Sequence, residues 1–284
     1  FVGENGSLMV GSYTINAEWI PFAEPYVVVS IFDAYLAVSG DVYYAMADEA
    51  VRQYRFEDGM LVFDKDIPLD TEYDRICTDS SGILYVSGFM DNFIAFQGDT
   101  QLFSHDGPDK VAMHPSGEWG ISWFSGPDVE KITLDDGTIQ YEDWSFPELD
   151  SIRQMQINAE HIFVTGLSET NEEIAIFVYD LSGNLLLTLG DTEFGEPDSL
   201  GSITAIVETP NGYMGLDGNM RNFCFWKLDG TFIGLLDVTD LVGTSYPWLS
   251  TAVLMPDGSI LVGMTQERDD ESADEFLVYR LTGF

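Results

Sequence analysis

Two kinds of tight-turn sequence alternate six times along this chain, and this alternation restricts the fold more than any other feature. The first kind is SGD (39–41), DSSG (79–82), HPSG (114–117), NAE (158–160), TPNG (209–212) and MPDG (255–258). The second kind is EDG (57–59), QGD (97–99), DDG (135–137), LSG (181–183), LDG (228–230) and LTG (281–283). Gly, Asn and Asp between apolar runs are typical of hairpins, because they accept a left-handed backbone. Two hairpins repeated about every forty residues predict an all-β, six-bladed β-propeller.

The N-terminal segment is expected to complete the ring. The last turn, LTG, is followed only by Phe284, so the sixth blade lacks an outer strand of its own. The segment SLMVGSYT (7–14) has strand character, and we expect this N-terminal strand to pair with 276–281, closing the last blade and removing an open sheet edge. The expected blades are 26–65, 73–104, 109–143, 151–190, 201–237 and 248–284, in a single domain over residues 1–284.

The charge balance excludes several classes of partner. The chain carries 49 acidic and 11 basic residues, a net charge of −38. Such a surface repels nucleic acid and anionic membranes. The acidity has two interpretations: it keeps an exposed, secreted or salt-adapted protein soluble, or it binds divalent cations. Because no EF-hand spacing occurs, we expect no cofactor, and calcium stays the alternative.

Two features of the sequence bear on the location of the protein. No apolar run is long enough for a transmembrane helix, and the mean hydropathy is +0.01. The chain opens on Phe1 without a signal peptide, as expected of a mature or trimmed product. We expect an extracellular or cell-surface monomer.

Residues with catalytic or metal-binding chemistry are few. His105, His114 and His161 have no histidine or cysteine at ligand spacing, so no metal site is expected. Cys77 and Cys224 fall in strands of non-adjacent blades, which favours small buried side chains over a disulfide. No nucleophile elbow, Walker loop, Rossmann fingerprint or HExxH motif occurs. The acidic run 267–275 is typical of a solvated loop.

Three basic residues share one spacing relative to the first kind of turn. Counting back seven positions from Gly82, Gly117 and Glu160 leads to Arg75, Lys110 and Arg153. This spacing predicts that all three begin inner strands and lie at one mouth of the axial channel. They would form an anion-binding half-ring there. The alternative is that each pairs with a local carboxylate such as Asp74 or Asp109 and has a structural role.

Aromatic residues and prolines gather in the segments expected to lead into the blades: 19–25, 67–73, 144–149, 193–197 and 246–248. Aromatic rings with polar edges suit peptide side chains or sugar faces. The candidate ligand contacts are Trp19, Trp144, Tyr246 and Trp248. The alternative is that these rings fill gaps between blades.

Two runs carry a resemblance to a known group of propellers. DRICTDSSGILYVSG (74–88) and IFVYDLSGNLLLTLGD (176–191) resemble six-bladed repeats of the NHL and TolB-like kind. That group includes binding scaffolds, lyases and calcium-dependent lactonases. Lactonase-type propellers hold a metal with Glu, Asn and Asp at inner-strand positions. Here those positions are expected to hold Arg75, Lys110 and Arg153, which argues against a channel metal.

Two functions remain open at this stage. The first is a non-catalytic module that recognises a peptide, protein or glycan on the face carrying the linkers between blades. The second is a lactonase- or lyase-like enzyme that acts on an anionic sugar or lactone at the channel mouth. The lack of a catalytic motif favours the first function.

Overall fold

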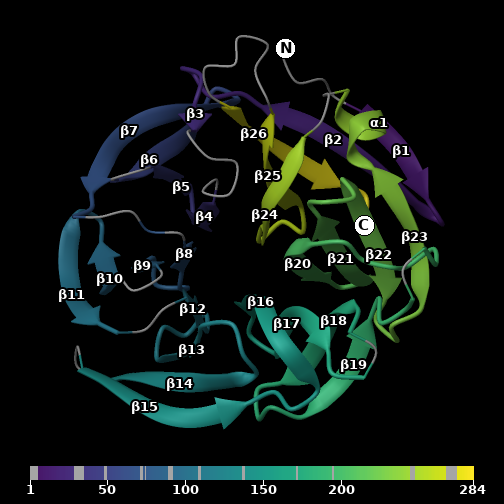
Figure 1. Cartoon of the computed structure of the whole chain (residues 1–284). Coiled ribbons are helices and arrows are strands. Elements are labelled where there is room, and N and C mark those ends of the chain that lie inside the picture. Colours follow the sequence, from purple (N-terminus) through teal and green to yellow (C-terminus); the bar gives the residue numbers. More distant parts are fainter. Residues whose placement is uncertain are drawn as a thin grey trace.

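The structure is a computed structural model that describes residues 6–28, 35–47, 50–70, 73, 75–88, 92–107, 110–135, 138–170, 172–193, 195–243, 247–266 and 274–284. Six antiparallel sheets stand around a common axis (Figure 1). This arrangement confirms the predicted all-β, six-bladed propeller. Within the described part of the chain the one helix is α1 (Val238–Val242), which lies between the fifth and sixth blades.

The first five blades each contain four strands in chain order. Blade one consists of β4 (Leu36–Ser39), β5 (Val42–Ala47), β6 (Ala50–Glu57) and β7 (Met60–Pro68). Blade two consists of β8 (Arg75–Thr78), β9 (Leu84–Ser87), β10 (Asn92–Gln97) and β11 (Thr100–Asp106). Blade three consists of β12 (Lys110–Met113), β13 (Trp119–Trp123), β14 (Asp128–Asp135) and β15 (Thr138–Ser145).

The remaining blades follow the same plan until the ring closes. Blade four consists of β16 (Leu149–Ile157), β17 (His161–Ser168), β18 (Ile174–Asp180) and β19 (Leu185–Leu189). Blade five consists of β20 (Ile203–Thr209), β21 (Gly212–Asp217), β22 (Asn222–Lys227) and β23 (Phe232–Asp237). Blade six begins with β24 (Trp248–Leu254), β25 (Ile260–Gln266) and β26 (Asp274–Thr282) and takes its outer strands from the N-terminal segment.

Closure by an N-terminal strand is confirmed, but the residues that perform it differ from those predicted. β2 (Tyr13–Ile20) pairs with β26, whereas β1 (Gly6–Val10) pairs with β2 and lies one strand further out. The prediction that 7–14 pairs with 276–281 is therefore wrong. Gly11, with φ at +57°, forms with Ser12 a two-residue turn that divides the segment into two strands.

The start of blade one was also predicted too early. β3 (Val27–Val28) pairs with β26 and so belongs to blade six, although blade one was expected to begin at residue 26. The other predicted blade limits agree with the strand bounds to within three residues. The turn sequences therefore locate the blades well, and the segment that joins blade six to blade one is the exception.

The hydrophobic core lies between the blades. β21 and β25 contain only buried residues, because each sheet packs against a neighbour on both faces. Outer strands such as β11 and β15 are mostly exposed. The largest apolar cluster joins blades five and six through side chains such as Met214, Leu216 and Val262. Burial of this kind supplies most of the stabilising free energy and ties the blades into a ring.

Aspartates close several hairpins through local hydrogen bonds. Asp79 Oδ1 accepts hydrogen bonds from the backbone N–H groups of Ser81 and Ile83, both at 2.9 Å. Asp180, Asp229 and Asp257 form equivalent turns. The pKa of these three carboxyls is lowered mainly by hydrogen bonds that side chains in the same turns donate to them. A part of the high acid content therefore shapes turns.

The ring has two different faces. The hairpins between the first and second strands and between the third and fourth strands lie on one face, called here the hairpin face. The linkers between blades lie on the opposite face, called here the linker face. Each inner strand therefore runs from the linker face to the hairpin face.

Some groups on the inner strands are hydrogen-bonded to the neighbouring blade. Thr78 Oγ1 donates to the carbonyl of Val38 at 2.8 Å. The backbone N–H of Ile206 donates to Gln156 Oε1 at 2.6 Å. These contacts satisfy part of the backbone that would otherwise line the channel unpaired.

Candidate functional site

The inner strands of all six blades enclose an axial channel of about 390 Å³. The charged side chains among its described lining residues are Arg75, Asp79 and Glu208. Arg75 begins β8 at the linker face, whereas Asp79 and Glu208 lie close to the hairpin face. The channel therefore has a cationic end and an anionic end.

Arg75 lies between aromatic rings of the two neighbouring blades. Its guanidinium carbon is 4.9 Å from the ring centre of Tyr35 and 5.5 Å from that of Trp123. These distances are typical of cation–π contacts. Its Nε is buried without a hydrogen-bond partner, and no carboxylate in the described ranges forms an ion pair with it. The rings hold the guanidinium in place without neutralising its charge.

Two further buried polar atoms without a partner belong to residues that line the same channel. They are the indole Nε1 of Trp123 and the amide Oε1 of Gln154. Trp123 is 2% exposed and Gln154 is 8% exposed. Buried polar groups are normally hydrogen-bonded, so three such atoms around one channel require an explanation.

The hairpin hydrogen bonds correct the spacing of the predicted basic triad. The backbone N–H groups of Asp79, His114 and Asn158 bond to the carbonyls of Ile83, Trp119 and His161 and so close the three inner hairpins. Four positions before these donors stand Arg75, Lys110 and Gln154. The sequence count led to Arg153 instead of Gln154, because the NAE hairpin is shorter than the other two. A count of seven residues back from the end of this turn therefore reaches the position before Gln154.

Only Arg75 of the predicted triad lines the channel. Lys110 begins β12 as predicted, but it is half-buried, has an interaction of its own, and is not among the lining residues. Arg153 is exposed in a β-bulge between Ile152 and Gln154. A residue in a bulge is displaced from the regular pleat, which separates Arg153 from the channel. Ligand binding by Lys110 and Arg153 stays a prediction.

Two of the predicted aromatic contacts lie in outer strands rather than in linkers, and that part of the prediction is wrong. Trp19 lies in β2, packed against the core of blades five and six. Trp144 lies in β15, where Lys131 Nζ is 5.3 Å from its ring centre. It borders a second groove with Asp128, Glu130 and Asp143, and Trp123 lines both this groove and the channel. Trp248 is the half-buried first residue of β24, and Tyr246 lies outside the described residues.

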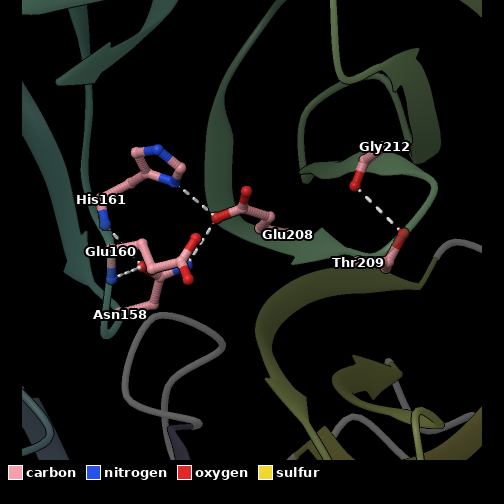
Figure 2. Close-up of polar contacts among 6 residues, drawn as sticks. All are labelled: Asn158, Glu160, His161, Glu208, Thr209 and Gly212. Atoms are coloured by element: carbon pink, nitrogen blue, oxygen red, sulfur yellow. Dashed lines mark hydrogen bonds and ion pairs between the residues drawn. The ribbon is translucent and has the colours of Figure 1, made fainter. Parts of the chain in front are cut away.

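The opposite end of the channel carries a polar cluster that joins blades four and five (Figure 2). Glu208 Oε2 is 2.8 Å from His161 Nδ1 and accepts a hydrogen bond from Asn158 Nδ2 at 2.7 Å. The side chains of His161 and Glu208 are 19% and 16% exposed. Nearby, Thr209 Oγ1 donates to the Gly212 carbonyl and closes the hairpin of blade five. Sequence reasoning missed this cluster because Glu208 lies 47 positions from His161.

Neither the cysteines nor the described acidic residues form a metal site or a disulfide. Cys77 and Cys224 lie in β8 and β22, as predicted, and both are free thiols. Burial raises the pKa of the Cys77 thiol to about 11 and also raises that of Cys224. In the part of the chain that the structure describes, no group of three or more His, Cys, Asp or Glu residues is placed to hold a metal ion. Most of the acidic run, 267–273, lies outside that part, as do Asp74 and Asp109.

Comparisons with known proteins identify the fold and no closer relationship. No protein-family model and no curated sequence matches the chain. A chain of Kuenenia stuttgartiensis hydrazine synthase superposes with a TM-score of 0.57 at 11% identity, covering 86% of this chain and 80% of that chain. The WD40 β-propeller domain of Doa1 gives 0.54 at 11% identity, over 99% of this chain and 97% of that domain. The chain is a β-propeller.

A third similar structure belongs to a protein assembly. A chain of the mitotic checkpoint complex superposes with a TM-score of 0.59 at 11% identity, covering 89% of this propeller and 81% of that chain. At such identities the likeness concerns the fold alone. No helix among the described residues is long and apolar enough to span a membrane.

Proposed function

We propose that this propeller is a non-catalytic binding module that recognises its ligand on the linker face, over the mouth of the axial channel. Arg75 is the anchor for an anionic group of that ligand. The observation that carries the proposal is the Arg75 guanidinium, held between Tyr35 and Trp123 with its Nε buried and unpartnered.

The net charge of the chain makes the surroundings of Arg75 informative. In a chain with a net charge of −38, carboxylates are the most available partners for any cation. Arg52, Arg55 and Arg280 pair with aspartates in this way. Arg75 instead contacts two aromatic rings. A guanidinium keeps its charge at every physiological pH and offers paired N–H donors to a carboxylate or phosphate. An arginine at a channel mouth that forms no ion pair within the described ranges therefore suits an anion.

A thermal-shift screen of the full chain tests the proposal. The probes are glucuronate, galacturonate and short acetylated peptides, each compared with an uncharged derivative. Binding to the native state raises stability in proportion to the logarithm of ligand concentration over Kd. Arg75→Ala is expected to abolish the shift given by the anionic probes. Arg55→Ala removes the same charge from an exposed pair with Asp64 and is expected to leave the shift unchanged.

The proposal fails if Arg75→Ala binds every probe as well as the unmodified protein does.

The second candidate is an enzyme that acts on an anionic sugar or lactone. It is favoured by one observation, the Glu208–His161 pair at the far end of the channel that Arg75 lines. Mass spectrometry of glucuronolactone and of oligogalacturonate after incubation separates the two functions. We expect no product, and product lost in His161→Ala with binding retained favours the enzyme.

Three finer statements belong to the same proposal. The assignment to the NHL or TolB-like kind is supported by the repeats at 74–88 and 176–191. An exported or cell-surface location is supported by the strong acidity, which suits an exposed protein. A monomer without cofactor is the simplest state of a closed ring. Cell fractionation and light scattering test the location and the oligomeric state.

A further inference from the structure

Three residues that line the channel each carry a buried polar atom without a partner, and the three atoms differ in hydrogen-bonding character. Arg75 Nε and Trp123 Nε1 are donors, whereas Gln154 Oε1 is an acceptor. We propose that Arg75, Trp123 and Gln154 recognise the C-terminal carboxylate of a peptide, together with the amide N–H of its last residue. This inference rests on the proposed function, because it specifies the anion that Arg75 anchors.

The two donors suit a carboxylate. Each carboxylate oxygen accepts more than one hydrogen bond, and a guanidinium together with an indole N–H offers several donors. The donors come from the first strand of blade two and the last residue of β13 in blade three, and the same channel lining contains both. Burial strengthens the contact, since Trp123 is 2% exposed and water competes little there.

The acceptor restricts the ligand further. Gln154 Oε1 needs an N–H or O–H donor, and a bare inorganic anion at neutral pH has little to offer it. In a peptide the amide N–H of the last residue is separated from the carboxylate by a single Cα. One C-terminal residue therefore presents two kinds of group to the channel at once. A hexuronate presents a carboxylate and hydroxyl donors in a similar way, so the polar atoms alone do not separate the two.

The net charge of the protein favours the peptide. A polyuronate carries one negative charge on each sugar, and a chain with a net charge of −38 repels such a polyanion. A peptide can carry its terminal carboxylate as its sole anion, with neutral or basic residues before it. Basic residues upstream are attracted to the acidic surface. The occupant that we infer is therefore a C-terminal segment that is neutral or basic before its last residue.

Affinity selection on the immobilised full chain provides the test. The probe is a pool of acetyl-Gly-Lys-Lys peptides extended by three randomised neutral residues, made once with a free C-terminus and once as the amide. Selected peptides are then titrated by calorimetry. We expect the free acids to bind and the amides to bind at least about tenfold more weakly, as removal of a charged hydrogen-bond acceptor requires.

Single variants separate the contributions of the three side chains. Arg75→Ala is expected to weaken the free acid at least about tenfold and to abolish its preference over the amide. Trp123→Phe keeps an aromatic ring but removes the N–H, and about a fivefold loss is expected. Gln154→Leu is expected to weaken the free acid, and it should not affect a peptide N-methylated at the last residue. Arg55→Ala is the control, and near-identical melting temperatures check the fold.

Each outcome of these titrations either supports or overturns the inference. Equal binding of acids and amides overturns the inference, even if Arg75→Ala weakens both and the proposed function stands. Binding of glucuronate that depends on Arg75, with no peptide bound up to about 1 mM, also overturns the inference and leaves the proposed function intact. If Arg75→Ala changes nothing for any probe, both are wrong. Binding of free acids that is weakened by all three variants supports both.

Discussion

Asp79 and Asp229 occupy the same kind of turn in two different environments, and the pair compares a buried, multiply hydrogen-bonded carboxylate with an exposed one. Asp79 is 5% exposed and also accepts hydrogen bonds from the hydroxyls of Ser81 and Tyr85. Asp229 is exposed and bonds to Thr231. The buried carboxylate leaves more groups unsatisfied when it is removed, because water cannot replace its hydrogen bonds.

We therefore expect Asp79→Ala to lower the free energy of unfolding by about 3 kcal/mol, whereas Asp229→Ala has only a small effect. Urea denaturation at neutral pH measures both variants. Tyr85→Phe provides an intermediate case, because it removes one of the hydrogen bonds to Asp79 and keeps the ring stacked on Phe93. Equal losses for the two aspartates would contradict this account.

Glu208 is a second residue whose replacement distinguishes an effect on stability from an effect on ligand binding. Glu208→Gln keeps the shape of the side chain but replaces a charged acceptor for His161 and Asn158 with a neutral amide. A loss of about 1–2 kcal/mol in the free energy of unfolding is expected at pH 7. Glu57→Gln, at an exposed position, is the control. Unchanged peptide binding by Glu208→Gln would agree with a ligand held at the opposite end of the channel.

At the scale of secondary-structure elements, the N-terminal hairpin has two strands with different roles. β2 contributes Ile15, Ala17 and Ile20 to the core, whereas the buried residue of β1 is Val10. Removal of residues 1–12 leaves β2 paired with β26. Removal of residues 1–20 exposes both the edge of β26 and the apolar surface beneath β2.

The shorter deletion is therefore expected to give a monomer with a lower melting temperature, and the longer deletion an aggregating protein. Size-exclusion chromatography and thermal unfolding distinguish them. A deletion of 1–20 that stays monomeric and melts like the full chain would mean that β2 does not close the ring.

Turn chemistry explains why the blades could be predicted and the site could not. The Gly and Asp residues of the hairpins are local signals, so they locate the strands that flank them. The Gly11–Ser12 turn was missed because it lies within an otherwise strand-like run. Gln154 was missed because a count from the turn ignores the length of the hairpin. An error of one position selects a side chain on the opposite face of the strand. The contacts of Trp123 and Glu208 join distant segments, which no local pattern reveals.

At the scale of the whole molecule, two electrostatic effects oppose each other as the pH falls. Repulsion within a chain of net charge −38 weakens as carboxylates become protonated toward the isoelectric point near 4.1. This repulsion opposes the compact state at neutral pH, and it weakens in mild acid as the net charge falls. The turn aspartates act in the opposite direction, because hydrogen bonds lower the pKa of Asp180, Asp229 and Asp257. Their contribution is complete above the unfolded pKa and is lost as the pH falls through the folded pKa.

These opposite signs predict a stability maximum in mild acid, at about pH 5, with a decline below about pH 4. The decline begins where the aspartates of the unfolded chain become protonated, and it continues as the pH falls through the lower pKa of the folded turn aspartates. Salt should weaken the long-range repulsion and leave the turn hydrogen bonds almost unchanged. Screening over about 8–10 Å weakens the long-range repulsion, but it hardly affects hydrogen bonds within a turn. Melting temperatures measured from pH 3 to pH 8 in low and physiological NaCl should therefore converge in acid and differ at neutral pH, where salt stabilises the fold. Calcium chloride at matched ionic strength should act as NaCl does. A larger shift with calcium would show that the acidic residues bind the ion, and the self-repulsion account would then be insufficient.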